Sequence, residues 1–272
     1  SDLSTGKLSV TGYQDYSDAQ KILKEVNKYR KKNGRKALKM DRGLTNSAIM
    51  RGFETTIYIP ETSPHRRPNG KLSKSINKKI IYENCAQSAG TTPKQIVKGW
   101  INSSTHRKGL LLSNAKSVGV AAVTVVSRDG YEANTWVLDF SSSKAKKVEK
   151  SKTRKQFTKN IVTKNSYLKK SYLKLDSRYG TIWETEKMQM KPTYQGKMMK
   201  EYGVYPTVIN TSSFTSWKSS NPSVASVDSN GRITGNKAGT ATISAKLKTG
   251  TKITISKKIK VVPTNQQIDP WE

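Results

Sequence analysis

Both histidines and the single cysteine of this chain fall within one window, from His65 to His106. The window also contains Glu83, which stands two residues before Cys85. Two imidazoles and a carboxylate are the groups that proton transfer requires, and they are also ligands for a divalent cation such as Zn²⁺. We therefore take His65, Glu83 and His106 as candidate site residues, for acid–base catalysis or for metal binding.

Other side chains in the window are given simpler roles. Cys85 lies in an apolar stretch, so we interpret it as a small buried residue rather than a nucleophile. Ser103, Ser104 and Thr105 offer hydroxyl groups beside His106, but their spacing from Trp100 is more typical of a helix cap than of a nucleophile. A single cysteine permits no internal disulfide, so the stability of the chain must come from its hydrophobic cores.

Local sequence signals suggest how the three candidate residues are positioned. Pro60 and Pro64 open a loop, and His65 stands just before 68–70, Pro-Asn-Gly, which favours a tight turn. Glu83 follows a short apolar segment, 80–82, and precedes a helix. Three separate elements could therefore bring these residues together.

Two helix starts follow Glu83. Thr92, Pro93 and Gln95 form the pattern of a capping box with proline at the first helical position. Ser104 is expected to cap a second, short helix that carries His106 near its start.

The rest of the first half reads as helices followed by strands. A helix is expected to begin at Ser17 and to end near Gly34, and a second helix is expected over 44–57. The apolar, β-branched segment 118–126 and the segment 135–140 then predict two strands, with Arg128-Asp129-Gly130 as a turn between them. This order predicts a mixed α/β domain.

The last third reads as all-β. Short strands are expected over six segments: 188–190, 207–209, 223–227, 232–234, 240–247 and 251–262. Asn230-Gly231 is a strong hairpin signal. Strands at this spacing predict a β-sandwich, with Trp217 as its core aromatic residue.

Charge is concentrated between these two parts. The chain of 272 residues has a net charge of +31, and 144–175 holds 12 Lys and Arg against one Glu. Such a segment should be solvated and attracted to a polyanion. Nucleic acid is not favoured, because no recognition motif accompanies the charge. Ile161-Val162 and Tyr167-Leu168 could still be edge strands of the following domain.

The resulting organisation has five parts. We expect an N-terminal arm over 1–15, an α/β domain over 16–143, a basic linker over 144–175, a β-sandwich over 176–264 and a tail over 265–272. No apolar run is long enough to span a membrane. The beginning of the chain shows neither an initiator Met nor a signal-peptide core, as in a mature secreted protein.

An ordered set of motifs over about residues 15–141 resembles bacterial CAP (SCP) domains, the superfamily of cysteine-rich secretory proteins, antigen 5 and pathogenesis-related 1. The motifs are 27–30, 65–70, 83–84, 100–107, 118–120 and 136–140. The resemblance implies an α-β-α sandwich with a cleft lined by His65, Glu83 and His106.

Three features depart from that family's pattern. Tyr82 replaces the usual glycine before the Glu-Asn pair, Ser103 stands where the animal and plant branch has a second cleft glutamate, and the disulfides of eukaryotic members are absent. The resemblance therefore supports a site of three residues rather than four.

Residues 217–235 and 238–243 resemble bacterial Ig-like domains of group 2, which usually serve as spacers or adhesive units on secreted proteins. The fold class is therefore α+β, an α-β-α sandwich joined to an Ig-like sandwich. The pairing implies an extracellular, secreted or wall-associated bacterial protein, Gram-positive because it lacks disulfide-forming cysteines.

Two functions follow from the resemblance and from the residues. The first is non-enzymatic binding of a lipid, a peptide or a wall component in the cleft, which requires no cofactor. The second is a hydrolase, in which His65, Glu83 and His106 hold a divalent cation such as Zn²⁺ or a histidine acts as general base. A third interpretation is a purely structural polar network. The basic linker is expected to bind anionic wall polymers such as teichoic acids.

Overall fold

The computed structural model describes residues 4–57, 63, 65–88 and 90–269. Pro60 and Pro64, expected in the loop before His65, lie outside the described residues. The chain forms two compact units. The α/β unit consists of Thr11–Val125 and Glu132–Lys159, and the β unit consists of Ser1–Val10, Val126–Tyr131 and Asn160–Glu272. No helix in the described ranges is long and apolar enough to cross a membrane.

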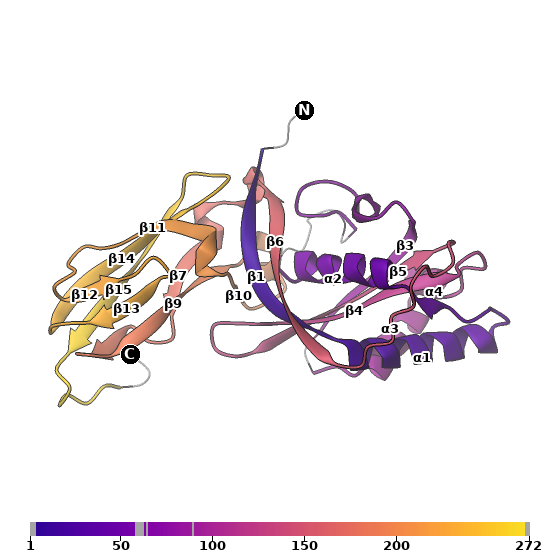
Figure 1. Ribbon diagram of the computed structural model, residues 1–272, viewed down its shortest axis with the longest axis horizontal. Coiled ribbons are helices and arrows are strands. Elements are labelled where there is room, and N and C mark those ends of the chain that lie inside the picture. Colours follow the sequence, from indigo (N-terminus) through magenta and orange to yellow (C-terminus); the bar gives the residue numbers. More distant parts are fainter. Residues whose placement is uncertain (1–3, 58–62, 64, 89, 270–272) are drawn as a thin grey trace. The chain divides into compact units, whose positions relative to one another are not determined.

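A mixed sheet with the strand order β3-β5-β4-β1-β6 is the framework of the α/β unit, and the short strand β2 pairs with β4 (Figure 1). The strands are β1 (Thr5–Asp15), β2 (Lys39–Met40), β3 (Ile80–Ser88), β4 (Ser117–Val126), β5 (Glu132–Ser141) and β6 (Arg154–Lys164). The strands β4 and β5 confirm the two segments predicted from their β-branched and apolar residues. Strand β3 stands at one edge of the sheet, which leaves one of its sides free of strand pairing.

Alternation along β4 and β5 gives the sheet two apolar faces. One face presents Val118, Val120 and Ala122 with the alternate residues of β5, and it packs in one core with helices α1 (Tyr16–Lys32) and α3 (Pro93–Asn102). The other face packs against α2 (Arg42–Ile57). The side chains of Ala121 and Val123 approach Gly52 of this helix so closely that a side chain at position 52 would collide with Val123. Helices on both faces confirm the α-β-α sandwich.

The helix starts follow their capping chemistry, with one shift. Helix α1 begins at Tyr16, and its cap is Asp15, whose Oδ1 accepts from the Asp18 amide at 2.9 Å, rather than Ser17. Helix α3 has the predicted capping box at Thr92. The next helix, α4 (Ser104–Leu110), has Ser103 at its cap position, without a capping hydrogen bond from the Ser103 hydroxyl to a backbone amide, so Ser104 is its first residue and not its cap.

Two segments expected to lie outside the domains are strands instead. Residues 5–15 form β1 rather than an arm, because alternate residues such as Leu8 and Val10 are completely buried. The basic segment contributes β6, which pairs with β1 and carries its charges on an edge strand. Of the two edge strands expected there, Ile161-Val162 lies in β6, whereas Tyr167-Leu168 lies at a 3₁₀ turn, η2 (Asn165–Tyr167).

The β unit is a sandwich of two sheets, which confirms the all-β prediction. One sheet has the order β10-β9-β13-β12 with β7 paired to β9, and the other has the order β11-β14-β15-β8. The strands are β7 (Leu173–Ser177), β8 (Thr181–Trp183), β9 (Lys187–Tyr194), β10 (Thr207–Val208), β11 (Phe214–Ser219), β12 (Ala225–Val227), β13 (Arg232–Gly235), β14 (Gly239–Leu247) and β15 (Thr254–Val262). A short helix, α5 (Lys197–Glu201), follows β9.

Two details of the β unit differ from expectation or sharpen it. Asn230 and Gly231 lie in the turn between β12 and β13, and Gly231 has a φ of +72°, as the hairpin signal predicts. Trp217 is only partly buried, whereas Phe214 and Tyr194 of the same unit are buried, and the Phe214 ring meets the Trp217 ring edge-on at 6.3 Å.

Candidate functional site

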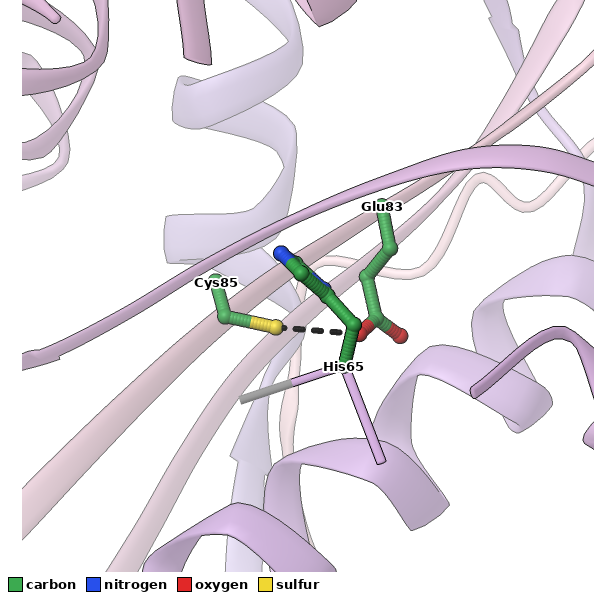
Figure 2. Close-up of side chains that lie close together, drawn as sticks. All are labelled: His65, Glu83 and Cys85. Carbon is green, nitrogen blue, oxygen red and sulfur yellow. Dashed lines mark hydrogen bonds and ion pairs between the residues drawn. The ribbon is translucent and has the colours of Figure 1, made fainter. Parts of the chain in front are cut away.

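His65 and Glu83 are in contact in the α/β unit. The Nδ1 atom of His65 lies 3.0 Å from Oε1 of Glu83, and Figure 2 shows the two side chains close together. Glu83 lies within strand β3, not in a loop before a helix, and its side chain is buried. The His65 side chain is 41% exposed. The pair therefore consists of an outer imidazole and an inner carboxylate that fixes the orientation of the ring.

A buried arginine occupies the other contacts of Glu83. Arg51 of α2 donates from Nε to Oε2 at 3.0 Å and from Nη2 to Oε1 at 3.1 Å. Burial by itself would raise the pKa of Glu83, but the hydrogen bonds from His65 and Arg51 outweigh it and lower that pKa to about 2. Glu83 is therefore an ionised residue that holds two cationic or polar partners in place.

A second ion pair fixes the loop that carries His65. Arg67 donates from Nε to both carboxylate oxygens of Glu54 on α2, at 2.9 and 3.1 Å. The loop closes on itself as well, since the Gly70 amide donates to the Arg67 carbonyl and Gly70 takes a φ of +87°. The tight turn predicted at 68–70 is thereby confirmed, and it presents His65 to β3.

Asp139 is the least expected member of the site. It stands directly opposite Glu83 in the register of β3 and β5, and its side chain is completely buried. Burial first, and then the charge of Glu83, raise the pKa of Asp139 well above its usual range. Within the described residues neither carboxyl oxygen of Asp139 has a hydrogen-bond partner, so burial beside the charge of Glu83 favours the neutral form of Asp139.

His106 approaches from the opposite face of the sheet. Its Nδ1 lies 2.9 Å from the Ser103 hydroxyl, and its carbonyl accepts from the Asn84 side-chain amide at 2.9 Å. Burial and then the charge of His65 lower the pKa of His106. His106 is therefore neutral at pH 7 and close enough to His65 to sense its charge, but within the described residues it forms no hydrogen bond with Glu83.

The edge strand β3 explains this arrangement. Side chains alternate along it, so Glu83 points toward α2 and Arg51, whereas Tyr82 and Asn84 point toward α4. The Tyr82 hydroxyl donates to the Thr105 carbonyl at 2.8 Å, and Gly109 packs against the Tyr82 ring. His65 and His106 thus flank one exposed strand edge from its two sides.

The donor atoms closest to one another at this site are those of His65, Glu83 and Cys85, all within 4.8 Å. The Cys85 thiol lies 3.3 Å from Oε1 of Glu83 (Figure 2), and burial followed by the charge of Glu83 raises its pKa well above the usual value. A protonated thiol is a poor metal ligand, and the Arg51 guanidinium on Glu83 opposes a nearby cation. This set of donors does not fit a divalent cation well.

Sequence reasoning missed Arg51, Glu54, Arg67 and Asp139. Three of them carried a signal. Arg51 and Glu54 stand one helical turn apart within the apolar segment 44–57, and Asp139 is a lone acid inside an otherwise apolar strand. Charged residues in such buried positions need partners.

Two family models match the chain. Residues 23–140 match the cysteine-rich secretory protein family, and residues 195–260 match the bacterial Ig-like domain, group 2. A curated relative, the uncharacterized protein YkwD of Bacillus subtilis, is 33% identical over 119 residues. That match covers 42% of this chain and 44% of the relative, so the chain spans less than half the length of this relative.

Solved structures give weaker likenesses. An extracellular protein containing an SCP domain from Bacillus anthracis has a TM-score of 0.34 and 18% identity, over 45% of this chain and 41% of that one. An outer surface protein from Borrelia burgdorferi has a TM-score of 0.37 and 16% identity, over 48% of this chain and 98% of that one. On the two family models, the chain carries a CAP domain of the cysteine-rich secretory protein family, followed by a bacterial Ig-like domain of group 2.

Proposed function

We propose that this chain is an extracellular bacterial protein whose CAP domain binds a ligand at the exposed edge of β3 without chemical turnover. The observation that carries the proposal is the saturation of Glu83. Both of its oxygens accept from Arg51, and one of them also contacts His65. A carboxylate with a pKa of about 2 is a weak general base at neutral pH, so its role is to orient His65.

The two histidines supply the recognition chemistry. Each ring uses Nδ1 within the protein, His65 toward Glu83 and His106 toward Ser103. Among the described residues neither Nε2 has a hydrogen-bond partner, which leaves both for a ligand. A fixed imidazole edge can donate to or accept from a polar group. The ligand class is a lipid, a peptide or a cell-wall component with such a polar group.

A hydrolase is the second candidate, and one observation favours it. His106 has a lowered pKa, so its neutral ring can accept a proton at pH 7, and Ser103 fixes its orientation. In that case His106 is the general base and His65, oriented by Glu83, is its partner. A metal-dependent route would instead use His65, His106 and Glu83 around a divalent cation such as Zn²⁺.

The partner proposed for the basic segment is an anionic wall polymer. In the α/β unit, Lys155 and Lys159 of β6 lie over the Phe157 ring, at 5.2 and 5.0 Å from its centroid. Phe157 therefore holds two charges together on an edge strand. The Ig-like domain is proposed as a spacer or adhesive unit.

The test uses the full chain and three probes: a disaccharide muropeptide, a pentapeptide and vesicles of phosphatidylglycerol and phosphatidylcholine. Binding is followed by calorimetry and product formation by mass spectrometry. His65→Ala and His106→Ala remove the two imidazoles, and Lys108→Ala, on the exposed side of α4, is the control.

Binding that both histidine variants weaken by about tenfold, with no product, supports a binding domain. Product that disappears in His106→Ala establishes the hydrolase instead. If no probe binds, or if both variants bind as the parent does, the proposed cleft is overturned. Zinc titration of the same variants tests the metal, which must bind the parent and neither variant.

A further inference from the structure

Outside the CAP site, the β unit contains a cavity of about 910 Å³ lined largely by basic and aromatic side chains. All its lining residues belong to the β unit. They are Arg128, Asp129, Gly130, Tyr131, Ser177, Arg178, Tyr179, Gly180, Lys191 and Lys257. Four cations and one carboxylate around a single cavity give it a strong positive potential.

Two of the cations are fixed by a buried acid. Asp176, at the end of β7, is 4% exposed and accepts from Arg128 Nη1 at 2.9 Å. The Lys257 ammonium lies 3.9 Å from the same oxygen. Arg128 also pairs with Asp129 at 3.0 Å. These contacts hold Arg128 and Lys257 against the cavity wall and partly neutralise them.

The other two cations, Arg178 and Lys191, are less constrained. Lys191 stands opposite Asp176 in the register of β7 and β9, and its charge adds to the hydrogen bond from Arg128 in lowering the pKa of Asp129. In the part of the chain that the structure describes, neither Arg178 nor Lys191 forms an ion pair with a carboxylate. Arg178 instead lies over the Tyr179 ring, 5.3 Å from its centroid. An arginine that is held by an aromatic face, with its donors unused, is suited to bind phosphate.

Aromatic rings line the same cavity. Tyr131 is 58% exposed and stacks on Tyr205, with ring centroids 5.0 Å apart and an interplanar angle of 10°. Stacking fixes the orientation of the Tyr131 ring, while its hydroxyl and its edge stay accessible. Rings of this kind combine an apolar surface with a polar end, which suits a hydroxylated carbon chain or a sugar.

We propose that this cavity binds a phosphate-bearing polyol or sugar, the repeating unit of an anionic surface polymer. Arg178 and Lys191 contact the phosphate, Arg128 and Lys257 add positive charge, and Tyr131 and Tyr179 contact the carbon chain. The volume exceeds that of a single phosphate, so it has room for the attached polyol or sugar. The choice of polymer rests on the proposed extracellular location, whereas the binding of phosphate does not.

Single-stranded nucleic acid is the competing phosphate polymer. Its binding proteins provide a groove that follows the backbone, with successive rings for the bases. Here the cations converge on one cavity, and one face of Tyr131 is already covered by Tyr205.

The experiment measures binding of glycerol 3-phosphate and of polyglycerol phosphate to the full chain by calorimetry. The double variant Arg178→Gln/Lys191→Gln removes the two unpaired cations. The matched control Lys218→Gln/Lys258→Gln removes the same charge from exposed positions of the β unit outside the cavity. Thermal unfolding of both variants establishes that they are folded.

The cavity variant is expected to weaken binding of both probes by about tenfold or more, and the control by less than about twofold. Equal losses in the two variants would show diffuse attraction to net charge and overturn the proposal. So would a parent that binds neither probe, or one that prefers an oligonucleotide to polyglycerol phosphate. His65→Ala should bind as the parent does, so failure of the CAP proposal is distinguishable from failure of this one.

Discussion

At the scale of single residues, the protonation states around Glu83 decide what the CAP site can do. Glu83 is held ionised by Arg51 and His65, while Asp139 is held protonated by burial and by the charge of Glu83. These two carboxyl groups occupy opposite positions on paired strands. Their pKa values are pushed apart, so Glu83 is an anion and the neutral form of Asp139 is favoured.

The first prediction concerns the pH dependence of stability. The pKa of Asp139 is higher in the folded state than its usual value of 3.8, which applies to the unfolded chain. As pH rises above 3.8, this difference lowers the free energy of unfolding. An asparagine has nearly the same shape as a neutral aspartic acid but does not titrate. Asp139→Asn should therefore be as stable as the parent near pH 3 and more stable at pH 7, which urea unfolding across this range will measure.

Glu83→Gln is the contrasting variant. It leaves the buried Arg51 without its carboxylate, so it should cost about 3–5 kcal/mol at pH 7. Because the pKa of Glu83 is lowered to about 2, its stabilisation should be present above pH 4.5 and lost as pH falls toward 2. If Asp139→Asn destabilises the chain at pH 7 as much as Glu83→Gln does, the assignment of a neutral Asp139 is wrong.

At the scale of elements, the site depends on how closely α2 packs against the sheet. Helix α2 carries both Arg51 and Glu54, the partners of β3 and of the His65 loop. Its first turn runs directly over Gly119 of β4, where an added Cβ would collide with the Leu44 carbonyl. Helix α2 can therefore approach β4 this closely only because position 119 has no side chain.

The second prediction follows from that packing. Gly119→Ala must push α2 away from β4, which should cost several kcal/mol and lengthen the contact between Arg51 and Glu83. Gly99→Ala on α3 is the matched control, because nothing lies within 4 Å of its added methyl group, and it should be neutral or stabilise by up to about 1 kcal/mol. Equal stabilities in thermal unfolding would contradict this account of α2.

At the scale of the whole molecule, net charge is the dominant property. The chain has a charge of +31, and β6 carries part of it on an edge strand. Such a charge attracts any polyanion over distances of about a Debye length, which shortens as salt is added. Diffuse attraction and the cavity of the β unit are therefore separate contributions to polymer binding.

The third prediction separates them by salt. Lys155→Gln/Lys159→Gln should reduce retention of the full chain on anionic wall polymer at about 50 mM salt and have little effect near 500 mM, where exposed charges are screened. Glu132→Gln/Glu201→Gln, which raises the charge by the same amount, should strengthen retention at low salt. Cosedimentation with polymer-coated beads measures both, and a salt-independent loss would refute a screened, diffuse role for β6.

Much of this protein could be predicted from sequence because the signals are local or periodic. The capping box at Thr92, the turn at 68–70, the hairpin at Asn230-Gly231 and the alternation along β4 depend on neighbours within a few residues. The ordered motifs from 27 to 140 added the fold and the cleft residues by resemblance. Local physics and motif order were thus sufficient for the fold class of both domains, but not for the strands β1 and β6.

Only the tertiary structure decided the partners and the protonation states of the site residues. The arm at 5–15 became a strand because it pairs with β4 and buries Leu8 and Val10, contacts that lie more than 100 residues away in the chain. The saturation of Glu83 required Arg51 from a helix and Asp139 from a neighbouring strand. The proton on Asp139 depends on burial and on a charge brought close by strand register, and no local pattern encodes either of them.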